Sequence, residues 1–169
     1  MKLTAEELSY RARALAQAHP LTALAKRYLD RAVAQQRLNQ PIPEIGIWAG
    51  ASLLNGYCLR CVEENDVDVH LATAADETTF PDLDELEEVA TRVASELRSD
   101  TGGRHLLGDD AVFDALDRII SSEVSNRLGH WRDSIDDKAW VEMEEYITWW
   151  VVKGYALRVA ETMTGALVV

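Results

Sequence analysis

PEIGIWAGASLLNGYCLRCVEE, residues 43–64, is the stretch that decides the fold class. It has no charged residue between Glu44 and Arg60, so a helix formed from it is apolar on every face and belongs in the centre of a domain. It is also rich in small residues, namely Gly46, Ala49, Gly50, Ala51, Ser52 and Gly56. Small residues let neighbouring helices approach closely. The stretch therefore predicts a central helix packed tightly against others.

On both sides of this segment, apolar residues recur at spacings of three and four, which is typical of amphipathic helices. A capping box at Thr4 to Glu7 opens the first helix. The others are expected from about Pro20 to Asn39, from Pro81, from near Asp109 to Gly129, and from about Asp137 to Met163. We expect an all-α fold, with six helices in an orthogonal or bundle-like domain, two of them central and apolar, and residues 1–169 forming one domain. Residues 65–80 are expected to form a mobile loop.

Composition and charge argue against several classes of partner. The chain has 169 residues and a formal net charge of -12, with 17 Lys and Arg against 29 Asp and Glu. Nucleic-acid binding depends mostly on Lys and Arg that neutralise phosphates, so no nucleic-acid partner is expected. The first ten residues include Glu6 and Glu7 and lack the apolar core of a signal peptide, so we expect a cytoplasmic protein. No apolar stretch reaches the roughly 20 residues of a membrane span, so no membrane partner is expected.

Two segments share the pattern Gly-Tyr-x-Leu-Arg-x-x-Glu, at residues 56–63 and 154–161, each late in a long apolar helix. Leu-Asp-Arg also occurs twice, at residues 29–31 and 116–118. These matches predict two three-helix halves, residues 4–66 and 82–165, related by a pseudo-twofold axis. The distance from Leu-Asp-Arg to Gly-Tyr differs between the halves, so a chance match stays open.

The repeated pattern allows two interpretations of its side chains. A small anionic ligand could bind between the two central helices, at Tyr57, Arg60, Tyr155 and Arg158, because arginine forms strong hydrogen bonds with carboxylates and phosphates. Alternatively, each arginine pairs with the glutamate three residues later on the same helix face and helps to lock the two helices together.

Cys58 and Cys61 form a C-x-x-C motif, a spacing used in redox exchange and in halves of metal sites. Two cysteines cannot complete a four-ligand zinc site by themselves. With Leu54 to Gly56 before it and acidic residues after it, the motif resembles that of the all-α AhpD-like peroxidase and carboxymuconolactone decarboxylase family. The resemblance covers one helix and implies thiol chemistry, but Asn65 stands where the family has its relay histidine. Ordinary buried cysteines are the alternative.

Two further groups of residues are candidates for chemistry. Arg13 and His19 loosely match the spacing of the Arg-to-His pair in the helical HEPN ribonucleases, but Ala14 stands where that family has a polar residue, and one such pair is expected by chance. His130, Asp133 and Asp137 offer three metal ligands if their stretch is helical, or a solvated linker with a helix cap if it is not. No resident cofactor is expected.

The tryptophans concentrate in the last helix, where the adjacent Trp149 and Trp150 point about 100 degrees apart. Both cannot face the same core, and tryptophan is enriched at protein interfaces. We therefore expect a non-catalytic helical protein that binds a protein partner or itself, as a homo-oligomer such as a homodimer, through Trp149 and Trp150. The alternatives are the small anionic ligand site, a metal-dependent enzyme site, and the AhpD-like thiol enzyme.

Overall fold

The fold is all-α, as the periodicity predicts. The computed structural model describes residues 3–19, 21–39, 43–65, 83–98 and 110–168, and these contain helices and no strand. Within these ranges the α-helices are α1 (Ala5–Ala16), α2 (Ala23–Asn39), α3 (Pro43–Asn65), α4 (Leu83–Arg98), α6 (Asp110–Leu128) and α7 (Asp137–Val168), with a short 3-10 helix, η2 (Gly129–Trp131), after α6. The loop expected at residues 65–80 falls, after Asn65, outside the described residues.

The ends of the helices follow local capping chemistry. The predicted capping box is confirmed, because the Thr4 hydroxyl accepts from the Glu7 amide and the Glu7 carboxylate accepts from the Thr4 amide. Helix α2 begins later than the predicted Pro20, because the Thr22 hydroxyl accepts from the Ala25 amide as an N-cap. Pro20 and Pro81 lie outside the described residues.

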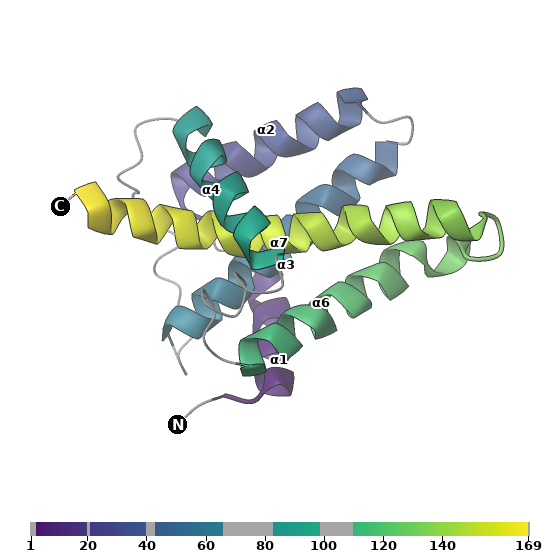
Figure 1. Cartoon of the computed structure of the whole chain (residues 1–169), viewed down its shortest axis with the longest axis horizontal. Helices are drawn as coiled ribbons and strands as arrows, with labels where there is room; N and C mark the ends of the chain where they lie inside the picture. The colour runs from purple at the N-terminus through teal and green to yellow at the C-terminus, as the bar shows by residue number, and fades with distance from the viewer. Residues whose placement is uncertain (1–2, 20, 40–42, 66–82, 99–109, 169) are drawn as a thin grey trace.

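Helices α3 and α7 form the centre of the molecule and pack against each other more extensively than any other pair. In Figure 1, α7 runs across the full width of the molecule, α3 passes behind it, and α4 crosses it in front. Helices α1 and α2 pack on α3, and α6 packs on α1, α3 and α7. The prediction of two central apolar helices is therefore confirmed.

The central helices cross where each has a glycine. A Cβ atom at Gly56 would lie 1.9 Å from the carbonyl oxygen of Val151, and one at Gly154 would lie 1.9 Å from that of Leu53. The contact is thus reciprocal and joins the backbones of the two helices. Any residue with a Cβ atom would prevent so close an approach. These two glycines set how closely α3 and α7 approach.

Candidate functional site

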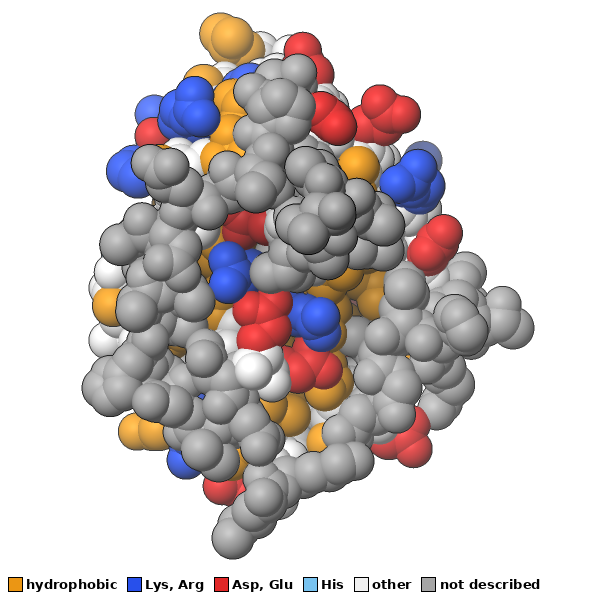
Figure 2. Space-filling view, turned by 90° about the vertical axis from the view of Figure 1, so that its left-hand side faces the viewer, with side chains coloured by type: hydrophobic (Ala, Val, Ile, Leu, Met, Phe, Trp, Pro, Cys, Tyr) orange, Lys and Arg blue, Asp and Glu red, His pale blue; other side chains and the backbone are white. Residues whose placement is uncertain are grey.

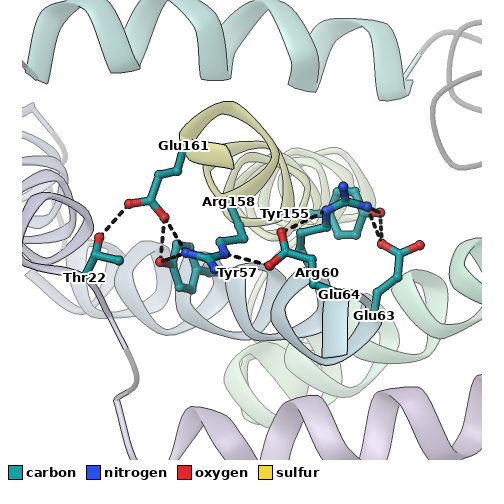
Figure 3. Close-up of polar contacts among 8 residues, drawn as sticks. All are labelled: Thr22, Tyr57, Arg60, Glu63, Glu64, Tyr155, Arg158 and Glu161. Atoms are coloured by element: carbon teal, nitrogen blue, oxygen red, sulfur yellow. Dashed lines mark hydrogen bonds and ion pairs between the residues drawn. The ribbon is translucent and has the colours of Figure 1, made fainter. Parts of the chain in front are cut away.

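A network of arginine, tyrosine and glutamate side chains joins α3 and α7 just beyond the glycine crossing (Figure 3). In its first arm, the Tyr57 hydroxyl donates to Glu161 Oε1 at 2.6 Å. Arg158 Nη1 donates to the same carboxylate oxygen at 3.2 Å and to the Tyr57 hydroxyl at 3.3 Å, and its guanidinium lies over the Tyr57 ring. Tyr57 is fully buried, and the Glu161 side chain is 2% exposed.

The second arm repeats the first with the two helices exchanged. The Tyr155 hydroxyl donates to Glu63, while Arg60 Nη1 donates to Glu63 Oε1 at 2.8 Å and to the Tyr155 hydroxyl at 3.2 Å. The Arg60 guanidinium lies over the Tyr155 ring at 5.6 Å, against 5.7 Å for Arg158 over Tyr57. Reciprocal contacts are what an internal duplication predicts, and the duplication itself stays a prediction.

Glu64 connects the two arms. Its Oε2 accepts from Arg158 Nε at 3.1 Å, and its Oε1 lies 3.4 Å from Arg60 Nε. Burial raises the pKa of Glu64, although both arginines lower it. Figure 2 shows Lys or Arg side chains beside Asp or Glu side chains in the middle of the face that lies to the left in Figure 1.

The arginines of this network face glutamates rather than a cavity. Two arginines meet three glutamates, so no positive charge is left over for an anion. Burial opposes the charge of Arg158, but Tyr57, Cys61 and the nearby glutamates outweigh it and raise the pKa of this guanidinium. The geometry therefore favours the structural interpretation of Arg60 and Arg158.

The two cysteines of the C-x-x-C motif lie inside the helix pair. Cys58 is fully buried and Cys61 is 1% exposed, and neither forms a disulfide bond. Burial raises the pKa of Cys58, and it raises the pKa of Cys61 to about 12. A reactive thiol needs the opposite, an exposed position and a lowered pKa.

We predict that neither thiol reacts in the folded protein. At pH 8 both stay protonated and shielded, so Ellman's reagent should modify Cys58 and Cys61 only as fast as the protein unfolds. Stopped-flow labelling across a urea series measures this rate. Labelling of two thiols within seconds in buffer without urea would contradict the prediction and revive the thiol-enzyme interpretation.

Trp149 and Trp150 both lie against a buried lysine. The Lys153 ammonium lies 5.5 Å from the Trp149 ring centroid, 5.7 Å from that of Trp150 and 5.9 Å from that of Tyr28, and its side chain is 4% exposed. Glu87 of α4 pairs with it at 2.9 Å and accepts from the Tyr28 hydroxyl. Trp150 is buried and Trp149 is partly buried against the core, so both rings flank the same cation although they are adjacent on the helix.

The candidate metal ligands are not brought together among the described side chains. Asp133 is exposed, and Asp137 is exposed and pairs with Arg132 at 3.3 Å. The backbone of His130 lies in η2, but its side chain is outside the described residues. No group of three His, Cys, Asp or Glu side chains suited to a metal occurs in the described part of the chain. Asp136 instead caps α7 by accepting from the Ala139 amide.

A pocket of about 740 Å³, open to solvent, lies between α1, α2, α3 and α6, and we call it the α1/α3 pocket. Its walls include the apolar side chains of Leu29, Ile47 and Leu54, and Gly50 and Ala51 of α3 leave room beside them. Sites for small molecules typically have volumes of roughly 300–1,000 Å³ and combine apolar walls with a few placed polar groups. The pocket has the size and the walls of such a site.

The floor of the α1/α3 pocket is polar and ordered. Glu123 of α6 is 4% exposed, and Asn55 of α3 is 8% exposed. Asn55 Nδ2 donates to Glu123 Oε1 at 3.0 Å and to the Ala51 carbonyl at 2.9 Å, while Arg127 Nε donates to Glu123 Oε2 at 3.1 Å. These bonds fix Arg127 and Asn55 in position.

The rim of the pocket carries Arg13 and His19, which the sequence analysis paired by their spacing. Arg13 makes no ion pair or hydrogen bond through its side chain with the described residues. His19 follows the end of α1 by three residues and has a φ of 50°, a conformation in which histidine is enriched. A pair with this spacing is expected by chance, so it did not predict the pocket. Nothing in the sequence pairs Asn55 with Glu123, which lie 68 residues apart.

No protein-family model, curated protein or solved structure matches the chain. Within the described residues, no helix has both the length and the apolar character that a membrane span requires.

Proposed function

We propose that this protein is a binding protein that holds a small molecule in the α1/α3 pocket. The observation that carries the proposal is the floor, where the buried Glu123 is held by Asn55 and Arg127 at the bottom of an open hollow. Burying a carboxylate is costly, and a core of apolar residues would stabilise this helix junction at lower cost. A buried polar group beside a pocket that is open to solvent is what a recognition site requires.

The α1/α3 pocket supports ligand binding better than the helix-crossing network does. At Tyr57, Arg60, Tyr155 and Arg158, the polar atoms contact one another, and none of these residues lines the pocket. The pocket instead offers donors at Arg13 and Arg127 beside apolar walls. The anionic-ligand site between the two central helices stays a prediction with less support.

Blocking the pocket tests the proposal. Ala14 is exposed on α1 and lines the pocket, so Ala14→Trp places an indole at its mouth without disturbing the core. Ala34→Trp is the matched control, because Ala34 is exposed on α2 away from the pocket. Native mass spectrometry of the freshly purified proteins should show a small-molecule adduct on the wild type and on Ala34→Trp, and none on Ala14→Trp. An adduct that survives in Ala14→Trp would place the ligand elsewhere.

Self-association remains a second candidate property. Trp149 and Trp150 are engaged with Lys153, but Ile47 is 51% exposed, Val141 is 55% exposed and Leu38 is 85% exposed. Large apolar side chains of this kind are available for contact with another copy or with a protein partner. The same native mass spectra report the oligomeric state. A cytoplasmic location stays our expectation for the compartment.

A further inference from the structure

We infer that the ligand of the α1/α3 pocket is a small organic anion, a carboxylate, sulfonate or phosphate ester with one apolar body, whose charged group pairs with Arg13. This inference rests on the proposed function, because it names the chemical class that the same pocket takes.

The charge of the pocket is opposite to that of the protein. Two arginines, Arg13 and Arg127, line it with a single carboxylate, Glu123, so the charged lining sums to +1 with His19 neutral. The whole chain carries -12. An anion therefore meets repulsion over most of the surface and attraction at this pocket, which concentrates its binding there.

The two arginines have different roles. Arg127 is held by Glu123 through Nε, so its charge is largely compensated and its orientation is fixed. Arg13 stands at the rim with no charged partner among the described residues, and it can form a bidentate pair with an incoming carboxylate or sulfonate. Arg13 is thus the group that selects for charge, and Arg127 supplies a fixed donor below it, whereas both Nδ2 hydrogens of Asn55 are used by Glu123 and the Ala51 carbonyl.

The apolar walls select for the rest of the ligand. Leu29, Ile47 and Leu54 come from α2 and α3, whereas Arg13 comes from α1. A ligand that contacts all of them has a charged group and an apolar body. An inorganic anion alone leaves the walls in contact with water, and an uncharged apolar molecule leaves Arg13 unpaired.

A pair of dyes with the same aromatic body separates charge from shape. The anion 8-anilinonaphthalene-1-sulfonate and its uncharged counterpart N-phenyl-1-naphthylamine both fluoresce when they leave water, so titration of each dye gives its affinity. The wild type should bind one sulfonate dye, at least tenfold more tightly than the uncharged dye. Arg13→Met should lower the affinity for the sulfonate dye by about tenfold, because one charge-assisted contact is lost. The same variant should change the affinity for the uncharged dye by less than about twofold.

Three controls make the result decisive. Arg92→Met removes the same charge from α4, away from the pocket, and should leave both affinities unchanged. Arg13→Lys keeps the charge and should retain part of the sulfonate affinity, and circular dichroism shows that each variant is folded. Suppose instead that the two dyes bind with equal affinity, that Arg13→Met affects neither, and that Ala14→Trp abolishes the binding of both. This result would contradict the preference for an anion and would still support ligand binding in the α1/α3 pocket. Absence of binding by either dye, or binding that Ala14→Trp does not reduce, would overturn the proposed function as well.

Discussion

Gly154→Ala and Gly56→Ala should each destabilise the protein by about 3 kcal/mol or more, at the upper end of the effects of overpacking. At both positions the new methyl group would lie 1.9 Å from a backbone carbonyl oxygen of the other central helix. Backbone cannot rotate away as a side chain can, so α3 and α7 must move apart along their whole contact. The gain in helix propensity, about 1 kcal/mol, does not offset this. Urea unfolding followed by circular dichroism measures the free energy of unfolding.

Other glycines of the same chain provide a graded control. A Cβ at Gly50 would meet the Cγ2 atom of Val33 at 2.8 Å, a side-chain atom that can move, and one at Gly129 would meet nothing within 4 Å. We therefore expect Gly50→Ala to have an intermediate effect, and Gly129→Ala to change stability by less than about 0.5 kcal/mol. Equal stabilities for Gly129→Ala and Gly154→Ala would show that the helices do not touch at their backbones.

The sequence predicts the parts of this structure that depend on contacts between residues close together in the chain. The central helices were predictable, since the composition of residues 43–64 and the Gly-Tyr pattern reflect packing within one helix pair. The reciprocal use of that pattern was also indicated, because each arginine finds its glutamate three residues away on the same helix. Local spacing carries this information.

The pocket and the lysine contact could not be predicted in the same way. Glu87 has the spacing of a solvent-facing residue of an amphipathic helix, yet it reaches a buried lysine 66 residues away. Glu123 likewise has no sequence feature that shows which helix covers it. Its burial depends on how α6 crosses α3. Helix periodicity fixes which residues share a face but leaves open which helix covers that face. Contacts of this kind follow from tertiary packing alone.

The second large effect is expected at the buried arm of the network. Arg158→Leu should lower the free energy of unfolding by about 3–5 kcal/mol, because it leaves the Glu161 carboxylate without its cation. The Glu161 side chain is only 2% exposed. Arg60→Leu is the matched control from the other arm. Its side chain is 27% exposed and that of Glu63 is 20% exposed, so water can hydrate the carboxylate left behind, and the loss should be smaller.

A double-mutant cycle separates the pair from the packing around it. If the cost of Arg158→Leu comes from an uncompensated charge, the double variant Arg158→Leu/Glu161→Leu should recover part of the stability that the single variant loses, because no buried carboxylate remains. If Arg158 instead served a bound anion, Arg158→Leu would remain as stable as the wild type and lose ligand. Measured together with the dye affinities, the cycle decides between the helix-crossing network and the α1/α3 pocket as the place where this protein binds an anion.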